Sequence, residues 1–295
     1  MLQRFLDPAT LASISGLDLV AKIVVDGFIA GLHRSPDYGF SQEFAEYRAY
    51  TPGDDLRHVD WNVFARSERV YLKRYRGETN TQLLILLDTS ASMGFGSHPV
   101  NKLDYARFLA ASLCYLAHAQ RDAAGLIVFD ETVVNYVAPS ARQGQLFRLL
   151  HAIEKAEPGT RTDFAKPFVH VLDFTRRRGL VVVISDFYER PEEIIKTVEP
   201  LRFRGNDVIL FHVLDPQEIA PHFREPVLLT DMENSSTLEV SPEYAHNEYR
   251  RKIDSHVQAL RDQAKGAGLD YFLMDSGRPL DEGLREYLAV RQGRM

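Results

Sequence analysis

Short apolar runs alternate with longer amphipathic stretches over most of the chain. The runs have the length of strands and lie at residues 83–88, 123–129, 180–185, 207–213 and 269–274. Apolar positions at helical spacing mark the stretches at residues 102–120, 144–155, 164–175, 191–202, 242–266 and 280–290. This alternation predicts the α/β fold class, with a doubly wound, mostly parallel sheet.

Two segments break this alternation. Residues 132–137 follow the second strand after a short turn, so we expect them to return as an antiparallel edge strand. Residues 226–240 contain two short apolar runs on either side of a polar centre. This pattern is typical of a hairpin inserted between regular elements.

The first part of the chain has a different pattern. Residues 11–34 carry apolar positions near a 3.6-residue period and predict a helix. Turn-forming residues predict an irregular segment at 35–55, and alternating apolar and basic residues predict an edge or hairpin strand at 69–75. We therefore expect an N-terminal extension, residues 1–79, packed on a main domain of residues 80–295.

The composition fits a folded protein with a large core. Of the 295 residues, 45% are hydrophobic and 26% are charged. The formal net charge of −6 argues against global nucleic-acid binding but allows a local basic patch. The single cysteine, Cys114, excludes an intrachain disulfide and a cysteine-rich zinc site. Because the sequence shows no secretion signal and no apolar run of about 20 residues, we expect a cytoplasmic protein.

The first aliphatic run ends in a cluster of oxygen-bearing side chains. Residues 83–87 are all leucine or isoleucine, and Asp88, Ser90 and Ser92 follow at alternate positions. Open α/β sheets bind ligands at the carboxyl ends of their strands. Carboxylate and hydroxyl oxygens suit a divalent cation such as Mg²⁺. The alternative is that the two serines only cap the turn and helix that follow.

Two more segments carry side chains that fit the same site. Asp186 follows the buried run at residues 180–185, and a polar loop at residues 159–163 contains two threonines. The first and fourth strands of a doubly wound sheet can be neighbours at its switch point. We therefore expect Asp88 and Asp186 to face one crevice, with a threonine arriving from the loop.

The order Asp-x-Ser-x-Ser, then Thr, then Asp resembles the metal-ion-dependent adhesion site of von Willebrand factor A domains. The resemblance covers residues 82–290 and implies their fold, with a mostly parallel sheet and one antiparallel edge strand. It implies that Ser90 and Ser92 are direct metal ligands. It also implies that Asp88 binds directly or through water, and that Asp186 acts mostly through water.

The resemblance also implies a threonine ligand and an open coordination position. Thr162 is the implied threonine because an acid follows it, and Thr160 is held in reserve. The cation would be Mg²⁺, or Mn²⁺ or Ca²⁺. Neutral hydroxyl ligands leave it under-neutralised, so that a carboxylate from a partner protein is favoured.

Four segments ahead of the first strand point to one branch of such proteins. They lie at residues 39–44 (Gly-Phe-Ser-Gln-Glu-Phe), 48–50 (Arg-Ala-Tyr), 53–61 (Gly-Asp-Asp-Leu-Arg-His-Val-Asp-Trp) and 65–66 (Ala-Arg). They are similar to the signature of an uncharacterised bacterial and archaeal family with a von Willebrand A-like domain. That family is associated with MoxR-type AAA+ ATPases, and the present chain resembles its short form without membrane helices. The resemblance implies an accessory role in the maturation or assembly of protein complexes.

The same region concentrates basic and aromatic side chains. Those that fit a partner-docking face are Arg57, Trp61, Arg66, Arg69, Lys73 and Arg74. Tryptophan, tyrosine and arginine are typical interface anchors. Alternatively, the arginines pair with nearby aspartates and hold the segment on the main domain, or the patch binds nucleic acid by stacking and charge.

An enzyme is the competing interpretation of the metal motif. An acid after an aliphatic strand also begins phosphatases of the haloacid dehalogenase type, which need a second acid two residues later. Ser90 stands at that position, and the chain has no Gly-x-Ser-x-Gly elbow or Walker loop. We therefore predict a non-enzymatic, cation-dependent protein-binding module, with a metal-dependent phosphohydrolase as the alternative.

Overall fold

The computed structural model describes residues 7–32, 44–49, 63, 70–75, 82–159, 164–174, 178–230, 232 and 236–292. The chain forms two compact units. One comprises Met1–Phe28 and Thr81–Met295, and the other comprises Ile29–Asn80. The division at residues 79 and 80 that the sequence suggests stays a prediction.

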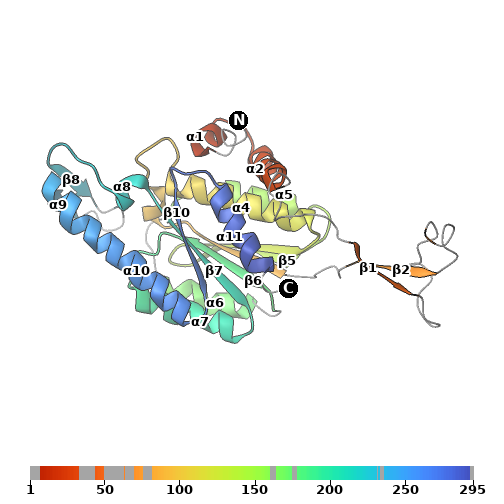
Figure 1. Cartoon of the computed structure of the whole chain (residues 1–295). Coiled ribbons are helices and arrows are strands. Elements are labelled where there is room, and N and C mark those ends of the chain that lie inside the picture. Colours follow the sequence, from red (N-terminus) through yellow and green to blue (C-terminus); the bar gives the residue numbers. More distant parts are fainter. Residues whose placement is uncertain are drawn as a thin grey trace. The chain divides into compact units, whose positions relative to one another are not determined.

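A six-stranded sheet forms the centre of the larger unit (Figure 1). Its strands are β3 (Gln82–Asp88), β4 (Ala123–Phe129), β5 (Val133–Ser140), β6 (Leu180–Ser185), β7 (Asp207–Leu214) and β10 (Asp270–Asp275). They follow the order β10-β7-β6-β3-β4-β5, and every neighbouring pair is parallel except β4 with β5. The predicted fold class, with one antiparallel edge strand, is confirmed.

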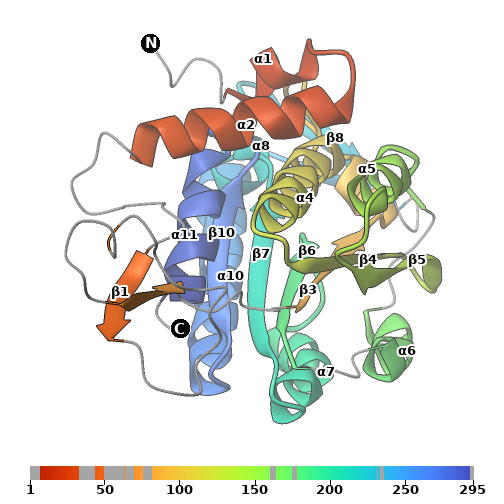
Figure 2. The same cartoon turned by 90° about the vertical axis from the view of Figure 1, so that its right-hand side faces the viewer.

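Helices cover both faces of this sheet (Figure 2). They are α4 (Lys102–Ala119), α5 (Gln145–Glu154), α6 (Ala165–Phe174), α7 (Pro191–Phe203), α10 (Arg250–Gly266) and α11 (Asp281–Gln292). On one face α4 lies between α5 and α11, and on the other α7 lies between α6 and α10. Because side chains alternate along a strand, Leu84 and Leu86 of β3 pack toward α6, α7 and α10, while Ile85 points to the α4 side. The central strand is therefore buried on both faces.

Short elements connect strand ends to these helices. They are the 3₁₀ turn η3 (Ala91–Gly94), α8 (Pro216–Ile219), α9 (Pro242–Tyr244) and a π-helical turn (Ala245–Tyr249) that continues into α10. A separate antiparallel pair, β8 (Val227–Thr230) with β9 (Thr237–Val240), occupies the segment where the sequence indicates an insertion.

The N-terminal helix differs from its prediction. In place of one helix over residues 11–34, the structure has α1 (Pro8–Ala12) and α2 (Leu17–Leu32). Gly16 lies between them and has a φ of 95°, a backbone conformation that residues with a Cβ rarely adopt. Among the described residues, no helix is long and apolar enough to cross a membrane.

The smaller unit contains an antiparallel pair, β1 (Phe44–Ala49) with β2 (Tyr71–Tyr75). The β2 strand lies within the predicted strand at residues 69–75. The prediction of an irregular segment at 35–55 is wrong at β1. There a bulge between Phe44 and Glu46 shifts the register, which leaves only the four residues 46–49 with the two-residue alternation that marks a strand.

Candidate metal centre

The carboxyl ends of β3 and β6 bring two of the predicted site residues together. The strands are parallel neighbours, with Leu87 opposite Ile184, so the residues that follow these two positions share one edge of the sheet. Asp88 is the last residue of β3, and Asp186 directly follows β6. Their exposed fractions are 0% and 1%, so both acids lie beneath the surface.

Asp88 is held by hydrogen bonds to both of its carboxylate oxygens. Oδ1 accepts from the backbone N–H of Ser90 at 2.8 Å, and Oδ2 accepts from the hydroxyl of Ser185 at 2.6 Å. Burial and the nearby charge of Asp186 raise the pKa of Asp88 to about 7, against the opposing effect of these hydrogen bonds. A pair of buried carboxylates of this kind favours a cation between or beside them.

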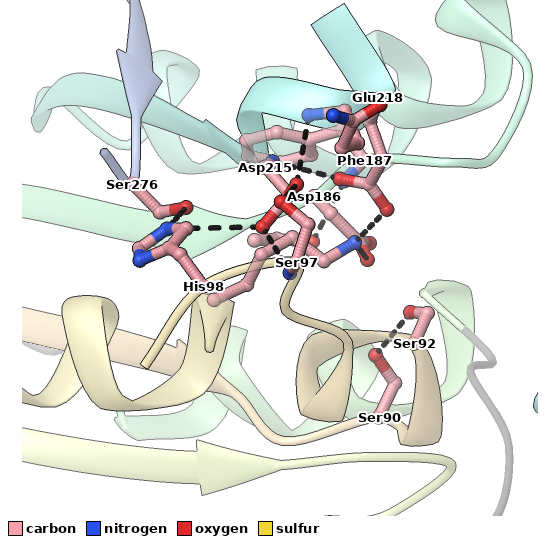
Figure 3. A network of polar contacts seen from close by, with 12 residues as sticks. Ser90, Ser92, Ser97, His98, Asp186, Phe187, Asp215, Glu218 and Ser276 are labelled. Carbon is pink, nitrogen blue, oxygen red and sulfur yellow. Dashed lines mark hydrogen bonds and ion pairs between the residues drawn. The ribbon is translucent and has the colours of Figure 1, made fainter. Parts of the chain in front are cut away.

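The two serine hydroxyls turn toward each other. Figure 3 shows Ser90 and Ser92 in its lower part, joined by a dashed line, and their Oγ atoms lie 3.1 Å apart. Ser90 stands at the N-cap of η3, but its side chain makes no capping hydrogen bond. The Ser90 side chain therefore does not cap η3. Its hydroxyl faces a second hard oxygen instead.

Gly159, the first residue of the threonine loop, contacts the same turn. The backbone N–H of Gly159 donates to the carbonyl oxygen of Thr89, at 2.6 Å. Thr89 in turn donates from its N–H and its hydroxyl to the carbonyl oxygen of Phe129, which ties the turn to β4. The predicted ligands Thr162 and Thr160 lie outside the described residues.

A lysine that the sequence analysis missed lies beside Asp186. Lys102, the first residue of α4, is 0% exposed and donates from Nζ to Asp186 Oδ2 and Glu218 Oε1, both at 2.8 Å. Burial alone would lower the pKa of this ammonium, but the charges and hydrogen bonds of the two carboxylates raise it above its usual value. The sequence carries a weak signal, because a cation in the first turn of a helix opposes the helix dipole.

Glu218 is positioned by the end of β7. Asp215 caps α8, and Glu218 accepts a hydrogen bond from the Asp215 backbone N–H at 2.8 Å, which completes a capping box. Asp215 also accepts from the N–H and hydroxyl of Ser97, at 2.8 and 2.5 Å (Figure 3). The sequence Asp-Pro-Gln-Glu after an aliphatic strand was the available signal for this box.

The donor set fits a divalent cation. Hydroxyl and carboxylate oxygens are ligands of the kind that Mg²⁺ accepts. When ionised, the carboxylates of Asp88, Asp186 and Glu218 exceed the ammonium of Lys102 by two negative charges. No cluster of three or more His, Cys, Asp or Glu suited to a metal occurs in the described part of the chain, so serine hydroxyls are essential to such a site.

Of the predicted partner-binding residues, only Lys73 and Arg74 belong to the part of the chain that the structure describes. Arg57, Trp61, Arg66 and Arg69 lie outside the described residues. Lys73 and Arg74 belong to β2, where their backbones are paired with β1. Docking through these side chains stays a prediction.

The fold and these residues define an α/β protein with a candidate cation site at the carboxyl edge of its sheet. The family described as protein of unknown function DUF58 matches residues 46–263, and the chain belongs to this family. Uncharacterized proteins of Mycobacterium tuberculosis and Mycobacterium bovis are each 28% identical to it over 292 residues. The alignments cover 97% of this chain and 91% of each relative.

Solved structures with a similar fold come from Bacteroides. The conserved hypothetical protein BatB of Bacteroides thetaiotaomicron matches 72% of this chain and 99% of its own, with a TM-score of 0.51 and 16% identity. An aerotolerance-related membrane protein of Bacteroides fragilis matches 73% of this chain and 100% of its own, with the same TM-score and identity. At this identity the likeness concerns the fold alone.

Proposed function

We propose that this chain is a non-enzymatic, divalent-cation-dependent protein-binding module. The observation that carries the proposal is the paired hydroxyls of Ser90 and Ser92 next to the buried carboxylate of Asp88. Together with Thr162 and Asp186, these residues would hold Mg²⁺, or Mn²⁺ or Ca²⁺ in its place. The bound cation supplies a positive centre that accepts a carboxylate oxygen.

The partner in this proposal is a protein that presents an aspartate or glutamate to the cation. The family resemblance supports a MoxR-type AAA+ ATPase as the associated machine, and we propose the cytoplasm as the compartment. The module would serve it in the maturation or assembly of protein complexes. The basic and aromatic segment that includes Arg57, Trp61 and Arg66 would provide additional contacts for the ATPase.

Hydrolysis of a phosphoester is less consistent with the site. A nucleophilic aspartate must reach its substrate, whereas Asp88 is 0% exposed and both of its oxygens already accept hydrogen bonds. Ser90 also occupies the position where the general acid of such an enzyme would stand. Absence of phosphoester turnover with Mg²⁺ is therefore expected.

Cation binding is tested by isothermal titration of Mg²⁺ into the folded protein. We expect Asp88→Ala to abolish the binding heat while circular dichroism shows an intact fold. The matched control is Asp275→Ala at the end of β10, whose carboxylate interacts with Gly277 and Arg278 away from the serine pair. An Asp88→Ala variant that retains the wild-type Mg²⁺ affinity would refute the metal site.

Partner binding is tested separately. The tagged protein is mixed with the purified MoxR-type ATPase of the same organism, in Mg²⁺ or in chelator, and retention is compared. We expect retention with Mg²⁺ in the wild-type protein and its loss with chelator or with Asp88→Ala. Equal retention in all three conditions would contradict cation-dependent capture.

A further inference from the structure

The ammonium group of Lys102 is buried beside the candidate metal site, although its position in the helix disfavours a positive charge. It is the first residue of an 18-residue helix, a place where backbone N–H groups and the helix dipole disfavour positive charge. Burial adds to this cost. Both carboxylates that compensate it come from segments that follow strands: Asp186 directly follows β6, and Glu218 lies in α8, which follows β7.

Aromatic rings enclose the same ammonium. Nζ lies 4.7 Å from the ring centroid of Tyr188 and 5.9 Å from that of Phe95. With two hydrogen bonds and two ring contacts, the ammonium is enclosed by protein groups. Its charge therefore acts on its neighbours with little screening by water.

The carboxylate of Asp186 interacts with two charged groups, the ammonium of Lys102 and the carboxylate of Asp88. Its Oδ2 atom accepts the hydrogen bond from Lys102, and its charge interacts with Asp88. A divalent cation beside Asp88 would compete with the ammonium for the same carboxylate. This juxtaposition of a tethered cation and a candidate metal site is the basis of the inference.

We infer that Lys102 is a built-in competitor that weakens divalent-cation binding by occupying Asp186 and by repelling the metal. The inference rests on the proposed metal site and deepens it. Lys102 lowers the excess negative charge and restrains Asp186 from direct coordination. The bound cation then stays under-neutralised and exchangeable, which increases its demand for a carboxylate from a partner.

The first test compares Mg²⁺ titrations of the wild-type protein and Lys102→Met at one ionic strength. Methionine keeps an unbranched apolar side chain that is one atom shorter, and it removes the charge. Removing one buried like charge should tighten Mg²⁺ binding by roughly tenfold or more. Mg²⁺ should also raise the thermal unfolding midpoint of the variant more than that of the wild type. In the variant, bound Mg²⁺ compensates the charges of Asp186 and Glu218, which have lost the lysine as their partner.

A second pair of variants is compared if Lys102→Met does not fold. Glu218→Gln is compared with Lys102→Met/Glu218→Gln, where lysine and one of its carboxylates are removed together. The double variant has one buried unpaired carboxylate fewer than Lys102→Met. It should bind Mg²⁺ more tightly than Glu218→Gln alone, again by roughly tenfold or more.

The outcomes separate this inference from the proposed function. Wild-type binding with unchanged or weaker binding in the lysine-free variants overturns the inference and leaves the metal site standing. Binding only in the lysine-free variants supports the inference and overturns cation dependence in the natural chain. No binding in any of these proteins overturns both.

Discussion

The hydroxyl of Ser185, at the end of β6, donates a hydrogen bond to Oδ2 of Asp88, the last residue of β3, over 2.6 Å. The same Oγ atom accepts from the backbone N–H of Phe187 at 3.0 Å. Phe187 has a φ of 45°, a left-handed conformation that is uncommon for a residue with a side chain. Ser185 therefore links the candidate metal ligand to a strained turn on the neighbouring strand.

Substitution of Ser185 by alanine should destabilise the folded protein. It leaves the Oδ2 atom of Asp88 and the N–H of Phe187 without this partner in a site that is almost fully buried. We expect the free energy of unfolding to fall by about 1–3 kcal/mol, measured by urea denaturation. The control is Ser140→Ala, which removes an exposed hydrogen bond to the N–H of Arg142 and should change stability little. Equal effects of the two substitutions would contradict a structural role for the Ser185 hydroxyl.

The strand and helix order could be predicted because the main unit is regular. Its central strands are buried on both faces, so they occur as uninterrupted aliphatic runs such as residues 83–87. The antiparallel return at β5 was predictable from the short turn before it. Gly16 could not be identified as a helix break by period alone, because a glycine is tolerated within helical patterns.

The site was predictable only where its residues follow a strand in sequence. Asp88, Ser90 and Asp186 stand directly after aliphatic runs, so their place at the edge of the sheet follows from the strand pattern. Lys102 lies at the start of a helix and Glu218 lies in a capping box. Only the folded chain brings these two residues to the same edge of the sheet. A single sequence does not reveal that these two charges meet, because neither residue directly follows a buried strand.

The cysteine provides a test of the packing of α4. Cys114 is 0% exposed, and burial raises the pKa of its thiol to about 12. The reactive thiolate is therefore almost absent at pH 8 in the folded protein. We expect no reaction with a chromogenic disulfide reagent under native conditions and one thiol per chain in denaturant. Rapid labelling of the native protein would show that α4 does not pack as described.

Gly159 offers a way to alter the threonine loop without touching a metal ligand. A Cβ atom at this position would lie 2.5 Å from Oδ2 of Asp130, so that the Asp130 side chain or the loop must shift, and 3.0 Å from the Asp130 Cβ, which is a tight contact. The hydrogen bond from Gly159 to the Thr89 carbonyl leaves little room for the backbone to move away. Gly159→Ala should therefore displace the start of the loop that carries Thr162.

We expect Gly159→Ala to weaken Mg²⁺ binding in the titration described above, with the fold retained by circular dichroism. Asp130→Gly removes both clashing atoms, so the double variant Asp130→Gly/Gly159→Ala should regain most of the affinity. Asp130→Gly alone serves as the control and should bind as the wild type does. If Gly159→Ala binds Mg²⁺ normally, or if Asp130→Gly gives no rescue, the loop entered at Gly159 does not contribute a ligand to the metal.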